Sequence, residues 1–135
     1  MLRAIGTTFD VDAFLRDSPL PADPAFHKGE PRIPGRPDGP LKGASGFNAT
    51  VSRAGFDDLP GQVMDATDFL NEHEDELRRL GAFEGVEEVC LDFGVRRRDA
   101  PAQSDLFPAG LLWRAGALDI DLVVTQYVVD EEAPD

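Results

Sequence analysis

Hydrophobic positions recur with two different periods along the chain, and these periods predict its elements. Residues 47–52 and 86–95 alternate between apolar and polar positions, which is typical of strands that bury one face. Residues 1–9 and 118–129 are rich in apolar and β-branched residues, so we expect two further strands there. In the strand at 86–95, the side chains expected to face the core are Val89, Leu91, Phe93 and Val95.

The longest predicted helix begins near Pro60 and ends just before Gly81, as one continuous element. Acidic residues just before Pro60 favour a helix start, and Gly81, just past Arg78-Arg79-Leu80, favours a helix end. The apolar stripe of this helix is Ala66, Leu70, His73, Leu77 and Leu80. The opposite face carries Asp65, Asp68, Glu72 and Glu76, with no Lys or Arg between residues 57 and 76. We therefore expect an acidic helix surface, with His73 at the boundary of the core.

Two shorter helices complete the pattern. Asp10 is placed to cap a helix that buries Phe14 and ends before Pro19. A last helix, capped by Ser104 or Asp105, is expected to end at a glycine near residue 116.

A long irregular segment separates the first helix from the strand at 47–52. Seven of the eleven prolines lie between residues 19 and 40, and five of the thirteen glycines lie between 29 and 46. Residues 31–40 place proline at every third position, which matches the period of a polyproline II helix. This segment is expected to be a stiff connecting loop, with a peptide-like recognition segment as the alternative.

The order of elements predicts the fold class. A single α+β domain over residues 1–129 follows from four strands interleaved with three helices, and 135 residues suffice for a core without disulfides. We expect an antiparallel-rich β-sheet with helices packed on one face, ferredoxin-like or an elaboration of it. Residues 19–46 form a Pro/Gly-rich loop insertion in this domain, and residues 130–135 are expected to be a flexible acidic tail.

Charge is distributed unevenly along the chain. The formal net charge is −13 at pH 7, and residues 56–135 carry twenty acids against six bases, whereas residues 1–55 carry six against seven. Such an acidic surface repels nucleic acid and anionic lipid and attracts basic proteins. The sequence thus argues against a nucleic-acid or membrane partner.

The chain carries no recognisable catalytic or cofactor signature. Its single cysteine, Cys90, cannot form an internal disulfide, and Glu88 and Asp92 beside it would raise its pKa, which disfavours a nucleophile. The carboxylates of the long helix lack the converging histidines that a di-iron site needs, so no metal or cofactor is expected. The N-terminus lacks the apolar run of a secretory signal, and no stretch is apolar enough for a membrane helix. We expect a cytoplasmic protein.

Several short motifs occur in an order that resembles a known family. They are the Lys28-Gly29-Glu30 triplet, the strand opening at Ser45-Gly46-Phe47, the helix end at Glu76-Leu77-Arg78, and Tyr127 near the chain end. With Leu111-Leu112 and the run that begins at Ala117, they cover nearly the whole chain. This pattern resembles the bacterial family known as domain of unknown function 4279. The resemblance implies a bacterial origin and supports the α+β fold, and it assigns no catalytic residues.

Three functional interpretations follow. The first is a non-enzymatic acidic protein that docks on or neutralises a basic protein such as a toxin domain, as bacterial immunity proteins do; its contact residues would be Asp65, Asp68, Glu72, Glu76, Asp119, Asp121 and Tyr127. The second is a small-ligand sensor or enzyme with a pocket under the proline-rich loop, lined by His27, Lys28, Glu30, Arg96 and Arg98. The third is an accessory module that associates with itself.

Overall fold

The computed structural model describes residues 1–128, so the predictions for residue 129 and for the tail at 130–135 lie outside the described residues. The elements in chain order are β1 (Leu2–Gly6), α1 (Val11–Arg16), β2 (Ser45–Ala49), α2 (Leu59–Glu72), α3 (Glu74–Ala82), β3 (Glu88–Arg97), α4 (Ala109–Ala117) and β4 (Asp121–Val128).

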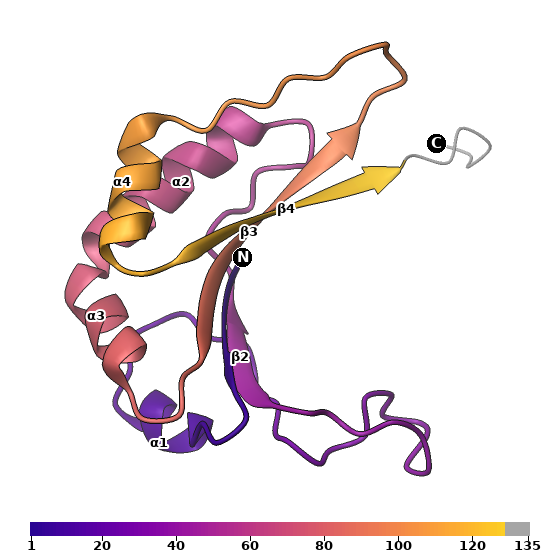
Figure 1. The fold of residues 1–135 in the computed structure, drawn as a ribbon, viewed down its shortest axis with the longest axis vertical. Coiled ribbons are helices and arrows are strands. Elements are labelled where there is room, and N and C mark those ends of the chain that lie inside the picture. Colours follow the sequence, from indigo (N-terminus) through magenta and orange to yellow (C-terminus); the bar gives the residue numbers. More distant parts are fainter. Residues whose placement is uncertain (129–135) are drawn as a thin grey trace.

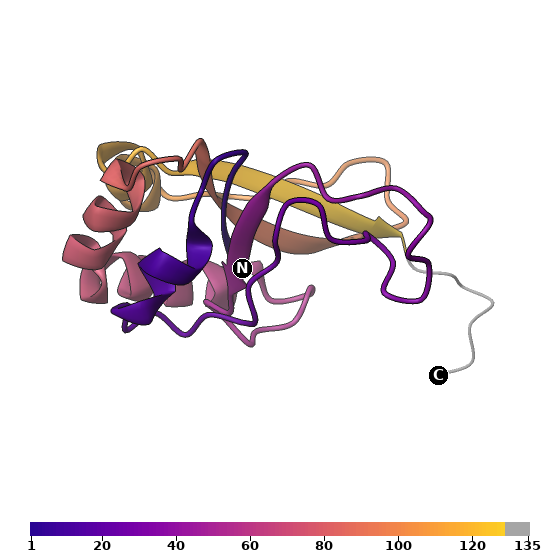
Figure 2. The same ribbon diagram turned by 90° about the horizontal axis from the view of Figure 1, so that it is seen from below.

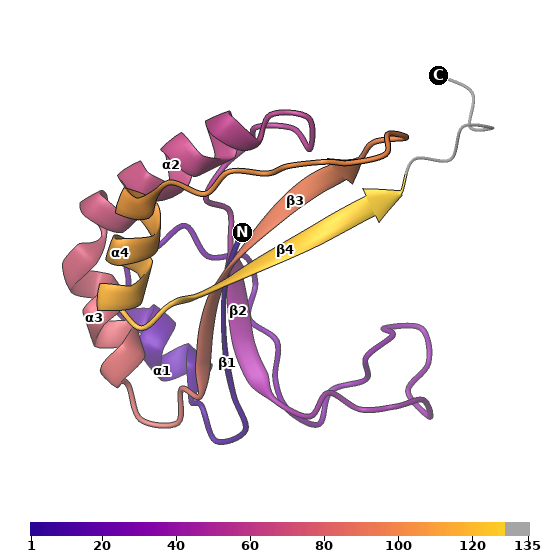
Figure 3. The same cartoon turned by 45° about the horizontal axis from the view of Figure 1, so that its top comes forward.

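The four strands form one mixed sheet in the order β2-β1-β3-β4. β1 pairs antiparallel with both β2 and β3, whereas β4 runs parallel to β3, from Cys90 opposite Asp121 to Arg97 opposite Val128. The parallel pair is joined by a crossover that contains α4, as parallel strands require. All four helices lie on one side of the sheet, and none of them covers its other face within residues 1–128 (Figures 1 and 3).

These observations confirm the predicted fold class, a single α+β domain with an antiparallel-rich sheet and helices on one face. The central antiparallel pair of β1 and β3 is compatible with a ferredoxin-like sheet. The element order departs from the β-α-β-β-α-β order of that fold because α2 and α3 lie between β2 and β3, and the parallel pairing of β4 with β3 is a second difference. None of the helices within residues 1–128 has both the length and the apolar character needed to cross a bilayer.

The core lies between the helices and the sheet face that they cover. The four residues predicted to face inward from β3 are all buried, at 1–7% exposure. The apolar positions of α2 and α3 at Ala66, Leu70, Leu77 and Leu80 are also buried, as predicted. At the α1 end, four phenylalanines pack with ring centroids 5.3–6.5 Å apart, and they are Phe9, Phe14, Phe47 and Phe83.

The predicted long helix is wrong in one respect, because it is broken at His73. This residue has φ −109° and ψ 23°, and it ends α2 and begins α3. Three consecutive acids, Glu74 to Glu76, then occupy the first turn of α3, where carboxylates interact favourably with the positive end of the helix dipole. The start was predicted correctly, since the Asp58 carboxylate accepts a hydrogen bond from the Gly61 amide at 3.0 Å.

The predicted cap of the last helix is also wrong. Ser104 and Asp105 lie in an extended segment, and α4 begins at Ala109 after Pro108, without a side-chain cap. Proline fixes φ near −65° and has no N–H to satisfy. A helix can therefore begin after proline without a side-chain cap. Phe107 in this segment packs edge-on against Phe93 of β3, with ring centroids 5.3 Å apart, and this contact holds the segment across the sheet.

The proline-rich segment forms a connecting loop, as expected, but it is not a polyproline II helix. Its first part pairs with β2 through the bridges Ala22–Ala49 and Phe26–Gly46. Its distal part folds back on itself, because Pro31 pairs with Leu41 and two hydrogen-bonded turns interrupt the proline repeat. Figure 2 shows this segment extending beyond the sheet on the side away from the helices.

Candidate functional site

Exposed acids line the outer surface of α2 and the start of α3. Asp65, Asp68 and Glu72 are exposed on α2, and Asp75 is exposed in the first turn of α3. We call these four residues the acidic ridge. The Asp65 carboxylate accepts a hydrogen bond from the Ser52 hydroxyl, which fixes it against the chain that precedes α2. The structure gives the other three carboxylates no ion pair with a described residue.

Glu76 does not belong to this exposed surface, contrary to the sequence prediction. Its side chain is only 12% exposed, and it pairs with Arg79 on the next turn of α3. The Arg79 guanidinium also lies 4.0 Å from the centre of the Phe14 ring and donates a hydrogen bond to the Phe14 carbonyl at 2.9 Å. Because the helix breaks at His73, Glu76 is turned toward α1 and serves to anchor α3 there.

The break between α2 and α3 creates a hollow of about 360 Å³ beside the acidic ridge. Glu72, Glu74 and Asp75 line it, together with Pro19 and His73. Glu74 is paired with Arg78 at 2.8 Å, so Glu72 and Asp75 are the carboxylates left without a described partner there. His73 sits at the boundary of the core, as predicted, and its ring contacts the Phe69 ring with centroids 4.6 Å apart.

The outer face of the sheet brings together a second group of predicted contact residues. Because β3 and β4 are neighbours, Glu88, Asp92 and Asp121 lie on one face with Tyr127. Asp119 lies outside this face, in the turn before β4, with a positive φ of 57°. Tyr127 is 45% exposed and stacks on Phe56, which sequence reasoning had not placed here.

Two positive groups reduce the acidity of this sheet face. Arg3 of β1 stands opposite Cys90, and the N-terminal amine of Met1 donates to the Asp92 carbonyl at 3.0 Å. The Asp92 carboxylate itself accepts a hydrogen bond from the Thr125 hydroxyl at 2.7 Å. The face is therefore a mixed polar surface and not a second strongly acidic one.

Cys90 is unsuited to act as a nucleophile. It is 5% exposed, and burial raises the pKa of its thiol, with a further contribution from Glu88. Asp92 and Asp121 act in the same direction, whereas Arg3 opposes them. The thiolate, the reactive form of cysteine, is therefore disfavoured at this position.

His27 is held between two carboxylates. Its Nε2 lies 2.8 Å from Asp12 of α1, and its Nδ1 lies 3.1 Å from Glu30. The hydrogen bond to Asp12 is the main cause of a raised pKa at His27, although burial opposes it. Both ring nitrogens are engaged, so neither is free to take a proton from a substrate, and the cluster ties the proline-rich loop to α1.

The five residues of the predicted ligand pocket do not line one cavity. His27, Lys28 and Glu30 lie near the Gly46 end of β2, which is level with Glu88 at the start of β3. Arg96 and Arg98 lie eight and ten residues further along, about 26 Å or more away at ~3.3 Å per residue. Arg96 instead pairs with Asp57 at 3.2 Å.

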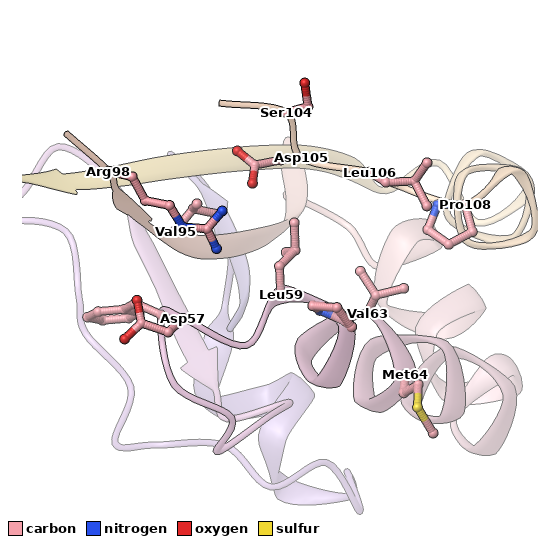
Figure 4. A pocket seen from close by; sticks show the side chains of 12 residues that line it. Asp57, Leu59, Val63, Met64, Val95, Arg98, Ser104, Asp105, Leu106 and Pro108 are labelled. Atoms are coloured by element: carbon pink, nitrogen blue, oxygen red, sulfur yellow. The ribbon is translucent and has the colours of Figure 1, made fainter. Parts of the chain in front are cut away.

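An apolar groove that sequence reasoning missed lies at the other end of the sheet. Its volume is about 460 Å³, and it is bounded by the start of α2, the end of β3 and the extended segment before α4 (Figure 4). Of the predicted pocket residues, only Arg98 reaches it. A signal was present in the sequence, since Leu59 and Val63, and Pro60 and Met64, form two apolar i,i+4 rows and widen the apolar surface at the start of α2.

The described residues contain no group of three or more His, Cys, Asp or Glu side chains arranged to hold a metal ion. Taken together, the fold and these surfaces define an acidic α+β domain with an exposed carboxylate surface on its helices and an apolar groove. Comparison with known proteins found no match to this chain among family models, curated proteins or solved structures. The resemblance drawn from the sequence motifs therefore stays a prediction.

Proposed function

We propose that this protein is a non-enzymatic binding protein that docks a basic protein on its acidic ridge. The observation that carries the proposal is the arrangement of Asp65, Asp68, Glu72 and Asp75 as exposed carboxylates on consecutive turns of α2 and α3. No Lys or Arg lies between residues 57 and 76 to neutralise them locally. Such a one-sign surface steers an oppositely charged partner and raises its association rate.

The hollow at the α2–α3 break supports the same proposal. Glu72 and Asp75 line it without a described ion-pair partner, and its volume of about 360 Å³ is large enough to admit a long side chain. A lysine or arginine from the partner would reach two carboxylates there. Charge-assisted hydrogen bonds of this kind are shorter and stronger than neutral ones. The acidic ridge would thus steer a basic partner by its charge along α2 and bind it specifically at the hollow between α2 and α3.

The groups best able to perform chemistry are engaged in structural roles. The pKa of the Cys90 thiol is raised by burial, and both ring nitrogens of His27 are bonded to carboxylates. This arrangement favours a binding role over a catalytic one. The binding role proposed is of the kind that bacterial immunity proteins perform. The outer sheet face supports the proposal less than the ridge does, because Arg3 and the N-terminal amine offset its acids.

The test compares two variants with the same net charge. In the ridge variant, Asp68→Asn, Glu72→Gln and Asp75→Asn remove three exposed carboxylates; Asp65 is kept because it bonds Ser52. In the control variant, Asp23→Asn, Asp38→Asn and Asp99→Asn remove three exposed carboxylates elsewhere. Each protein is immobilised, exposed at low salt to lysate from its source organism, and eluted with a salt gradient before mass spectrometry.

We expect one basic protein to bind wild type and the control variant in stoichiometric amount, to elute as salt rises, and to be missing from the ridge variant. Equal retention by the ridge variant would contradict the proposal. So would equal loss from both variants, because general charge and not the ridge would then govern binding.

A further inference from the structure

The apolar groove at the end of β3 has three walls from distant parts of the chain. Leu59, Val63 and Met64 come from α2, Val95 comes from β3, and Leu106 and Pro108 come from the segment before α4. Figure 4 shows Leu106 and Pro108 across the groove from Val63 and Met64. The contact of Phe107 with Phe93 fixes the third wall over the sheet. The groove is therefore part of the packed fold.

Apolar side chains around the groove remain in contact with water. Leu106 is 78% exposed and Met64 is 67% exposed, although Val63 and Val95 beneath them are buried at 7% and 3%. Because the side chains at both the floor and the rim of the groove are apolar, water in the groove has few hydrogen-bond partners. An apolar molecule that displaced this water would gain the free energy of burying these surfaces.

One cation stands at the groove without a described partner. The Arg98 guanidinium makes no hydrogen bond or ion pair with residues 1–128, whereas its backbone N–H bonds Gln103 at 2.8 Å. The two acids at the groove are engaged. Asp57 pairs with Arg96 at 3.2 Å, and Asp105 accepts from the Gln103 amide at 3.3 Å.

We propose that this groove binds a small molecule that has an apolar body and a carboxylate head, with the body between α2 and Leu106 and the carboxylate on Arg98. Arginine presents a planar fork of N–H groups that matches a carboxylate with two parallel hydrogen bonds. A mostly apolar cavity with a small number of orienting polar groups is the usual character of a small-molecule site, and the volume falls in the usual range of such sites.

Volume limits the size of the ligand. If each non-hydrogen atom takes the ~30 Å³ that a water molecule occupies in the liquid, about 460 Å³ admits roughly 15 atoms. A medium-chain fatty acid of about twelve carbons has this size. The lining residues of this groove are not those of the acidic ridge. The proposal for the groove can therefore be confirmed or contradicted independently of the proposed docking function.

Dodecanoate, kept below its micelle concentration, is the probe, and isothermal titration calorimetry with the full chain is the measurement. We expect binding with 1:1 stoichiometry. Dodecyltrimethylammonium has the same tail with a cationic head, and we expect it to bind at least tenfold more weakly. This comparison is stringent because the net charge of −13 favours the cation wherever binding is non-specific. A preference for the cation, or uptake of dodecanoate without saturation, would overturn the proposal.

Two matched pairs of variants locate the site. Arg98→Gln should weaken dodecanoate binding about tenfold, whereas Arg97→Gln, which does not line the groove, should leave it unchanged. Leu106→Asp should abolish binding, whereas Leu41→Asp, at a comparably exposed leucine in the proline-rich loop, should not. Because Leu106 and Leu41 are 78% and 52% exposed, both variants should fold. Equal effects within either pair would contradict the assignment.

Discussion

Phe56 and Tyr127 stack face to face on the outer side of the sheet, with ring centroids 4.5 Å apart and planes 14° from parallel. Phe56 precedes α2 and Tyr127 lies near the end of β4, so the contact joins two segments about seventy residues apart in the sequence. The Phe56 carbonyl also accepts a hydrogen bond from the Arg96 amide at 3.1 Å, beyond the point where β1 stops pairing with β3. The stack therefore fixes the C-terminal ends of β3 and β4 to the chain that leads into α2.

The coupling between the two rings should be measurable. Phe56→Ala and Tyr127→Ala, singly and together, form a double-mutant cycle, and we expect a coupling free energy of about 0.5–1.5 kcal/mol. Urea unfolding of the four proteins measures it. Additive effects of the two substitutions would show that the rings do not stabilise each other.

Gly94 is required beneath this stack. A Cβ at this position would lie 2.6 Å from Cε1 of Phe56 and 3.2 Å from Cε2 of Tyr127. Gly94→Ala should therefore displace the rings and lower the free energy of unfolding by about 1–3 kcal/mol. Gly35→Ala is the control, since nothing lies within 4 Å of a Cβ there and its effect should be close to neutral or slightly stabilising. Equal stability of the two variants would contradict this account.

Gln62 is the buried polar side chain of the described core, at 7% exposure. Its amide donates to the Gly94 carbonyl at 2.8 Å and to the Gly55 carbonyl at 3.0 Å, so it joins α2 to β3 beyond the point where β1 stops pairing with that strand. Gln62→Leu should leave the Gly94 carbonyl without this donor and cost about 1–3 kcal/mol, whereas the Gly55 carbonyl still accepts from the Asp58 amide at 3.0 Å. Asn71→Ala, an exposed amide on the same helix, should change stability by less than about 0.5 kcal/mol. Chemical denaturation of both variants distinguishes the outcomes.

The His27 cluster makes the stability of the protein depend on pH in a defined direction. The hydrogen bond to Asp12 raises the pKa of His27 in the folded state, so its stabilisation is complete below the unfolded pKa of about 6.5 and is lost as pH rises through the folded value. The His27 backbone amide lowers the pKa of Glu30, so that contribution is present above the unfolded value and lost as pH falls.

His27→Gln should consequently destabilise the protein more at pH 5.5 than at pH 9, as measured by thermal unfolding at both values. In the Asp12→Asn, Glu30→Gln background, the same substitution should have a similar effect at both pH values. A larger effect at pH 9 would contradict the assignment of a charged imidazole.

Local patterns predicted most of the fold because the residues involved act within one element. Alternation placed Val89, Leu91, Phe93 and Val95 in the core, the Asp10 carboxylate accepts the predicted capping bond, and the Asp58 carboxylate caps the helix whose start the acids before Pro60 predicted. The break at His73 was missed because the apolar stripe continues across it, although the three acids that follow are typical of a first helical turn.

The surfaces were less predictable because they depend on contacts between distant segments. Asp65, Asp68 and Glu72 are exposed together because one helix carries them, whereas Glu76 is paired with Arg79, whose guanidinium lies over the Phe14 ring of α1. The groove needs the segment at 104–108 to cross β3, and no local pattern indicates this crossing. The predicted ligand pocket is wrong because it also depended on contacts between distant segments. Arg96 and His27 lie toward opposite ends of β3.

The most direct test of the docking function is the dissociation constant of the captured basic protein for wild type, the ridge variant and the control variant, measured in parallel at low and physiological salt. We predict that the ridge variant binds at least tenfold more weakly than the control variant at low salt, a difference of about 1.4 kcal/mol, and that the gap narrows as salt rises. Equal dissociation constants for the two variants would contradict the claim that the acidic ridge is the docking surface.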